Sequence, residues 1–115
     1  MPGNGRKEPD VEENKLLNCL KRRHYGWSKA VKSPVLEARF GISGRVLREM
    51  INELRCQGHP VCSDENGYYY ASTEAELLAT IRQLNSRISK IAKAKNGLVR
   101  TAKKCKDDGQ LRLPL

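Results

Sequence analysis

A three-residue break between two helical stretches constrains this chain more than any other feature. Ser33-Pro34 is a helix start signal, a hydroxyl N-cap followed by proline at the first helical position. Gly41 ends this first helix, because glycine adopts the left-handed conformation of a helix C-terminus without a steric penalty. Ser43 can cap a second helix, which Gly58 ends. Ser33–Gln57 therefore has the helix, short turn and helix of a helix-turn-helix motif.

A β-hairpin is expected directly after the second helix. His59-Pro60 prevents further helix, and the strands expected are Val61–Ser63 and Tyr68–Ala71. They flank Asp64–Gly67, in which Asn-Gly favours a tight turn because both residues tolerate positive φ. A hairpin in this position is the wing of a winged helix-turn-helix. Farther upstream, Ala30-Val31-Lys32 is a candidate short strand.

The N-terminal part divides into an arm and a helix. Residues 1–10 contain two prolines and two glycines without apolar periodicity, which predicts a disordered arm. From Val11 onward, Leu16, Leu17 and Leu20 recur at helical spacing, and Lys21–Arg23 suit a helix C-terminus electrostatically. The winged domain is therefore expected over residues 11–72.

A long helix should follow the wing. Thr73-x-x-Glu76 is a capping box. Five apolar residues then follow at spacings of 4, 3, 4 and 3: Leu77, Ile81, Leu84, Ile88 and Ile91. We name these five residues the seam, since such spacing keeps one side of a helix facing a partner helix. The pattern predicts a basic helix over 73–106 and a disordered tail over 107–115.

The seam has two possible partners. A second copy of the chain is favoured, because the pattern outlasts what so small a domain could cover; the alternative folds the helix back on its own domain. Lys95 in the series and Asn96-Gly97 indicate that firm pairing ends near Ala94. The helix carries no acidic residue between Leu77 and Lys106, so its basic end either follows phosphates or remains disordered.

The expected fold class is thus mainly α with a small β-hairpin wing (α+β), a winged helix-turn-helix plus a long C-terminal helix. The net charge of +9 and the pI near 9.7 favour polyanionic partners, nucleic acid before an anionic membrane surface, unless the charge serves solubility alone. No stretch approaches the ~18 apolar residues of a membrane helix, and no signal-peptide region is evident. We expect a cytoplasmic protein whose four cysteines are thiols.

One run of residues carries a family resemblance: Phe40-Gly41-Ile42-Ser43-x-Arg45-Val46-x-Arg48-x-x-Ile51-x-x-Leu54-Arg55-x-x-Gly58-x-Pro60-Val61. It resembles the winged helix-turn-helix of biotin-repressor-like proteins, found in biotin-ligase-type repressors and many bacterial regulators. Asn66-Gly67-Tyr68-x-Tyr70 matches the end of that family's wing, so the likeness covers about Leu16 to Ala71. The layout with a helical tail is also similar to small proteins of bacteriophages and prophages of Gram-positive bacteria.

Two positions depart from the family pattern. Glu37 stands where a small residue is usual in the first helix of the motif. The wing turn Asp64-Glu65-Asn66 is acidic, whereas wings that contact DNA are often basic.

The second helix of the motif carries the candidate base-reading face. At 100° per residue, one side is apolar, formed by Val46, Leu47, Met50, Ile51 and Leu54. The opposite side holds Arg45, Arg48, Asn52 and Arg55. Arginine can fork onto guanine and asparagine onto adenine in the major groove of double-stranded DNA. A solvated helix face is the alternative, and Glu49 is expected to pair with Arg45.

Phosphate contacts are expected beside this face. Ser43 and Gly44 are small enough for close approach to a phosphate at the helix N-terminus. Further candidates lie at Lys29, Lys32 and Ser33.

The aromatic residues are expected to serve the core. Tyr68 and Tyr70 should pack inward on Val61 and leave Tyr69 outward, while Trp27 should cover the core.

Metal and catalytic chemistry find little support. Cys56-x2-His59-x2-Cys62 offers three of the four ligands that zinc requires, and only His24 or Cys105 could complete the set, so we expect no metal site. No catalytic constellation, cofactor motif or small-molecule site is evident.

The leading hypothesis is therefore a sequence-specific, homodimeric double-stranded DNA-binding protein, acting in transcription regulation or in phage replication or maintenance. The alternative is a winged-helix protein-interaction adaptor with little DNA specificity. A weaker idea is single-strand or RNA binding through Tyr69 and the basic tail.

Overall fold

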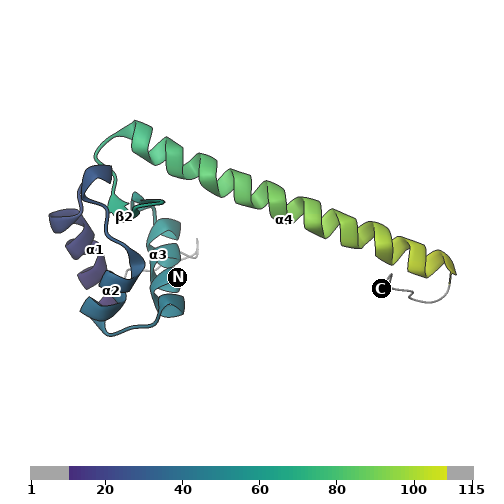
Figure 1. The fold of residues 1–115 in the computed structure, drawn as a ribbon, viewed down its shortest axis with the longest axis horizontal. Coiled ribbons are helices and arrows are strands. Elements are labelled where there is room, and N and C mark those ends of the chain that lie inside the picture. Colours follow the sequence, from purple (N-terminus) through teal and green to yellow (C-terminus); the bar gives the residue numbers. More distant parts are fainter. Residues whose placement is uncertain (1–10, 109–115) are drawn as a thin grey trace, which may run out of the picture. The chain divides into compact units, whose positions relative to one another are not determined.

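The computed structural model describes residues 11–108, so the predicted arm and most of the predicted tail lie outside the described residues (Figure 1). The helices and strands follow in the order α1 (Val11–Arg23), the 3-10 turn η1 (Trp27–Lys29), α2 (Ser33–Phe40), α3 (Gly44–Cys56), β1 (Val61–Asp64), β2 (Gly67–Tyr70) and α4 (Glu74–Asp108). The mainly helical fold, with a hairpin between α3 and a long C-terminal helix, confirms the expected fold class.

The hydrophobic core lies among the first three helices. Its buried members are Leu16, Leu17 and Leu20 of α1, Leu36 of α2, Leu47, Met50, Ile51 and Leu54 of α3, Val61 of β1, and Val31 in the segment before α2. The inward side of α3 is therefore the predicted one except at Val46, which is 39% exposed because it lies at the edge of the apolar face.

The turn between α2 and α3 has the predicted geometry. Gly41 adopts a left-handed conformation with φ of 63°, and its N–H donates to the Glu37 carbonyl. The Ser43 hydroxyl accepts from the Val46 N–H over 3.2 Å, which caps α3. The predicted cap of α2 was wrong: Lys32 is the N-cap, and Ser33, already helical, donates its hydroxyl to Glu37 over 2.7 Å.

The hairpin turns on two residues, Glu65 and Asn66, between the paired residues Asp64 and Gly67. The hairpin lies where it was predicted, but no non-glycine residue has positive φ within 11–108, so only the glycine of Asn66-Gly67 adopts that conformation. Instead, the Asn66 N–H donates to the Asp64 carboxylate over 2.7 Å. Gly67, with φ of 122°, is needed because a Cβ there would collide with the Val31 carbonyl.

The expected strand at Ala30–Lys32 is reduced to a single bridge. Val31 and Tyr68 exchange both backbone hydrogen bonds, at 2.9 and 2.8 Å. A second bridge joins Tyr25 to Tyr70. These bridges cover the edge of β2 that does not face β1.

Tyr69 and Trp27 do not lie where the sequence predicted. Tyr69 is only 3% exposed, whereas Tyr68 and Tyr70 are half-buried against the core. The outward placement of Tyr69 was wrong because the first turns of α4 cover the second face of the hairpin, with Thr80 bonded to Ser63. Trp27 does not cover the core: it is 58% exposed in η1.

Glu76 fastens the start of α4. Its N–H donates to the Thr73 hydroxyl over 3.2 Å, as in the predicted capping box. Its carboxylate accepts from the Ser72 N–H over 2.7 Å and from the Trp27 N–H over 3.0 Å. Although desolvation acts to raise the pKa of Glu76, these hydrogen bonds outweigh it and lower that pKa below its ordinary value.

The chain divides into two compact units that meet between Thr80 and Ile81. The second unit is the rest of α4, which continues as helix through Asn96-Gly97 to Asp108. Three seam residues are exposed: Ile81 at 43%, Ile88 at 62% and Ile91 at 68%. None of the helices described is long and apolar enough to cross a membrane.

Candidate nucleic-acid interface

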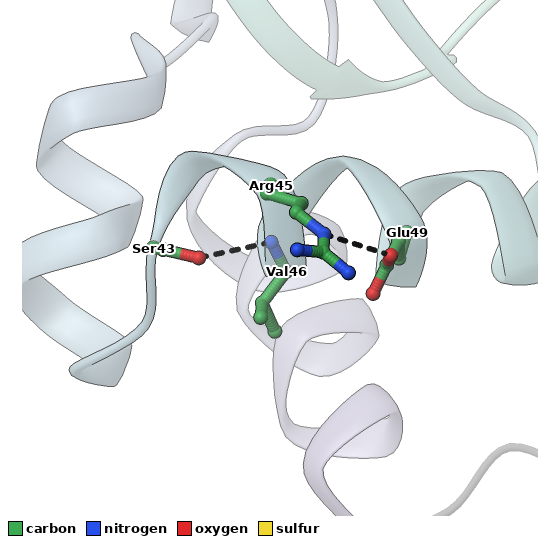
Figure 2. Close-up of polar contacts among 4 residues, drawn as sticks. All are labelled: Ser43, Arg45, Val46 and Glu49. Atoms are coloured by element: carbon green, nitrogen blue, oxygen red, sulfur yellow. Dashed lines mark hydrogen bonds and ion pairs between the residues drawn. The ribbon is translucent and has the colours of Figure 1, made fainter.

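The exposed side of α3 presents the candidate base-reading residues. Leu47 and Leu54 are fully buried, which fixes the rotation of the helix about its axis. Arg45, Arg48 and Asn52 lie on the opposite side and are exposed. The structure therefore brings these three side chains onto one face, and Figure 2 shows Arg45 along that helix.

Arg45 forms the predicted ion pair with Glu49. The Arg45 Nε and a Glu49 carboxylate oxygen are 3.5 Å apart, and the side chains are 82% and 65% exposed (Figure 2). An exposed pair of this kind contributes only ~0.3–0.5 kcal/mol. Arg45 can therefore exchange Glu49 for a stronger acceptor at little cost.

Arg48 and Asn52 keep their polar groups available. Among residues 11–108, neither side chain takes part in a hydrogen bond or an ion pair. A guanidinium offers five donors in a fixed fork, and an asparagine amide offers both a donor and an acceptor. These are the groups that recognise purine edges in a major groove.

Arg55 has a different environment from the other three. Its Nε donates to the Val61 carbonyl over 2.7 Å and its Nη2 to the Ser63 hydroxyl over 3.1 Å. The side chain is half-buried. Arg55 thus ties the end of α3 to β1 and fixes the hairpin relative to the exposed face of α3.

The N-terminus of α3 has a carboxylate beside it. A Cβ on Gly44 would lie 3.2 Å from a Glu37 carboxylate oxygen and 3.4 Å from an Arg48 guanidinium nitrogen. The absence of a side chain at Gly44 therefore makes room for Glu37. A phosphate approaching Ser43 and Gly44 would meet this carboxylate together with the helix N-terminal amides.

The other candidate phosphate contacts differ in availability. Lys29, in η1, and Lys32, the N-cap of α2, are exposed. The Ser33 hydroxyl is taken by Glu37. The acidic wing tip has exposed Glu65 and Asn66 at the turn itself. Of these candidates for phosphate contact, the two lysines are thus the accessible ones.

The cysteines do not gather around a metal site. No group of three or more His, Cys, Asp or Glu side chains within 11–108 could hold a metal ion. Cys56 is exposed, whereas Cys62 is fully buried and directs its thiol toward the Pro60 and Glu76 carbonyls. Burial raises the pKa of the Cys62 thiol, which opposes the thiolate that zinc binding requires.

One positively charged surface was not predicted from the sequence. An open pocket between α1 and α2 is lined by four cationic residues: Lys15, Arg22, Arg23 and Arg39. The signal in α1 is the i, i+3, i+4, i+7 stripe of Lys15, Asn18, Cys19 and Arg22. Arg39 lies in another helix, so helical periodicity alone does not bring it to this stripe.

Comparison with known protein families, curated proteins and solved structures gives no match to this chain.

Proposed function

We propose that the chain is a sequence-specific double-stranded DNA-binding protein that reads bases with the exposed face of α3. The observation that carries the proposal is the placement of Arg45, Arg48 and Asn52 on one exposed face, opposite buried leucines. An α-helix fits the major groove of B-DNA, where such side chains recognise guanine and adenine. The net charge of +9 adds sequence-independent attraction to phosphates.

Pairing of two chains through α4 belongs to the same proposal. Ile81, Ile88 and Ile91 share the seam and are exposed in the single chain. Isoleucine at one seam position and leucine at the next favour two-stranded helix pairs, and Leu77 to Ile88 follow this order, whereas Ile91 replaces the next leucine. A dimer would hold two α3 helices at a fixed half-site spacing.

The biological setting follows from this activity and from the resemblance of the helix-turn-helix motif to biotin-repressor-like domains. A dimeric reader of short DNA sites suits a transcriptional regulator or a phage replication or maintenance factor in the cytoplasm. Single-strand binding by base stacking on Tyr69 is not part of the proposal, because that ring is buried.

Selection from a random duplex pool tests the reading of sequence. The wild-type chain should enrich one motif. Arg48→Ala should relax the preference at one position and weaken binding to the preferred site by ~1–3 kcal/mol. Lys90→Ala, which removes an equal charge from α4, should leave the preferred motif unchanged. Failure of the wild-type chain to enrich any motif contradicts the proposal.

Salt dependence separates DNA binding from an adaptor function. Binding to generic duplex should weaken steeply as salt rises, because phosphate contacts release counterions. An adaptor that recognises another protein would have little duplex affinity even at low salt.

Solution mass tests the pairing. Ile88→Glu places a charge in the seam and should shift the chain from dimer to monomer. Ser89→Glu introduces the same charge one residue away, outside the seam, and should leave the dimer intact. A wild-type chain that is monomeric at every concentration contradicts the pairing.

A further inference from the structure

The pocket between α1 and α2 has a composition that the DNA-binding face does not explain. Its volume is about 460 Å³, within the ~300–1,000 Å³ range of small-molecule sites. No acidic residue among residues 11–108 lines it. Its wall consists of four cationic residues, the Asn18 amide, and the half-buried side chains of Cys19 and Phe40.

Arg39 is held in place by two side chains, and none of the described residues offers it an acidic partner. Its Nη1 donates to the Cys19 sulfur over 3.0 Å and lies 3.2 Å from the His24 Nε2. The opposite ring nitrogen, Nδ1, is 2.9 Å from the Lys29 carbonyl, which it can only approach as a donor. His24 thus presents an acceptor to Arg39, and the guanidinium keeps its Nε and Nη2 donors for a ligand.

The other cations are also available. Among the residues described, Arg22 and Arg23 form no ion pair, and Lys15 pairs only with Glu12, over 3.6 Å on an exposed surface. Four positive charges around one concave surface repel one another unless an anion joins them. A phosphoryl group suits this arrangement best, because guanidinium forks bind its oxygens through paired hydrogen bonds.

We propose that this pocket binds a phosphorylated small molecule of nucleotide size. The cationic residues would hold the phosphoryl groups, and Phe40 with Cys19 offers an apolar surface to the remainder of the ligand. The pocket is formed by α1 and the end of α2, whereas the base-reading residues lie on α3, so this proposal stands independently of DNA binding.

Titration of the full-length chain with inorganic pyrophosphate and with ATP, followed by calorimetry and by amide NMR shifts, tests the pocket. Both probes should bind and shift amide signals of α1 and the end of α2. Arg39→Ala should weaken binding about tenfold or more, the loss expected for a charged hydrogen bond. Arg22→Ala should weaken it similarly, and since this residue is exposed on α1, the variant tests the site without depending on the contacts of Arg39.

Arg45→Ala is the matched control. It removes one exposed arginine from α3, so it should leave pyrophosphate and ATP binding unchanged. Equal probe binding by wild type, Arg39→Ala and Arg22→Ala would overturn the proposal, as would an absence of binding by the wild-type chain.

Generic duplex DNA distinguishes the two sources of phosphate. If the pocket takes a small molecule, Arg39→Ala should bind duplex as the wild type does. If Arg39→Ala instead weakens duplex binding as much as Arg45→Ala, the pocket contacts the DNA backbone and the small-molecule proposal is wrong.

Discussion

The Thr80 hydroxyl satisfies both backbone polar groups of Ser63. Its Oγ1 is 3.3 Å from the Ser63 nitrogen, from which it accepts, and 3.4 Å from the Ser63 oxygen, to which it donates. Thr80 is 3% exposed, so one buried side chain of α4 takes the role of a neighbouring strand along the free edge of β1.

Thr80→Val should therefore destabilise the winged domain by about 1–3 kcal/mol. Valine keeps the shape of threonine but leaves the Ser63 N–H and carbonyl without partners in a partly buried place. Chemical denaturation measures the change. Thr101→Val is the control: that hydroxyl donates only to the Gly97 carbonyl one turn earlier, over 3.2 Å, so its loss should matter little. Equal stabilities of the Thr80 and Thr101 variants would contradict the role of Thr80.

The contact between Thr80 and Ser63 is one feature that the sequence alone does not predict. The helix-turn-helix could be predicted because each of its signals acts within one turn, as Gly41 and Ser43 do. The burial of Tyr69 could not, since alternation in β2 indicates only that successive side chains point to opposite faces. Whether the second face meets solvent depends on α4, a tertiary contact outside the strand pattern.

Only part of the candidate interface could be predicted from the sequence. The positions of Arg45, Arg48 and Asn52 follow from helical rotation once the apolar face of α3 is known. Arg55 shares their side of the helix, but its hydrogen bonds depend on the path of β1 after the helix ends. The position of the Glu37 carboxylate beside Gly44 depends on the angle between two helices, which side-chain periodicity does not determine.

Alanine in place of two glycines, Gly67 and Gly97, should change the stability of the chain in opposite directions. Gly67→Ala should cost about 2 kcal/mol or more, because alanine disfavours positive φ and its Cβ would displace the Val31 carbonyl from its bridge to Tyr68. Gly97→Ala should stabilise α4 by about 1 kcal/mol, since this glycine is helical and a Cβ there meets only the Arg100 guanidinium at 3.7 Å. Thermal unfolding followed by circular dichroism measures both. A Gly67→Ala chain as stable as wild type would show that the segment at Val31 moves freely.

Arg55→Ala should destabilise the domain more than Arg45→Ala. The first change removes two charged hydrogen bonds to β1, each worth about 1.5–3 kcal/mol. Arg45→Ala removes only an exposed ion pair, so the free energy of unfolding of this variant should remain within ~0.5 kcal/mol of wild type. Urea unfolding gives the free energies of unfolding. A stable Arg55→Ala domain would assign this residue to ligand contact instead of hairpin attachment.

Glu76 should make the free energy of unfolding depend on pH in the acidic range. Its pKa is lowered in the folded chain by hydrogen bonds, so its contribution to stability is fully present above the pKa of an unfolded glutamate and is lost as pH falls through the lower pKa of the folded chain. Glu76→Gln should therefore be less stable than wild type at neutral pH, and the difference should shrink in acid. Unfolding midpoints from neutral pH to pH ~3 measure this. Glu74→Gln, in the same helical turn, is the control and should lower the free energy of unfolding less at neutral pH. If the difference in stability between wild type and Glu76→Gln stays constant in acid, the carboxylate of Glu76 does not stabilise the fold in the way proposed.

Glu37→Gln should strengthen duplex binding by the proposed interface. Its carboxylate lies beside Gly44, where a DNA phosphate would approach the α3 N-terminus, and two negative charges about 4 Å apart repel by ~1 kcal/mol even in water. Glutamine keeps the shape and can still accept from the Ser33 hydroxyl, so the fold should persist. Fluorescence anisotropy at low salt should show tighter binding by a few-fold, fading as salt screens the charge. Glu12→Gln changes the net charge equally but lies on α1. If it strengthens binding as much as Glu37→Gln, net charge alone controls affinity and Glu37 has no local effect at the α3 N-terminus.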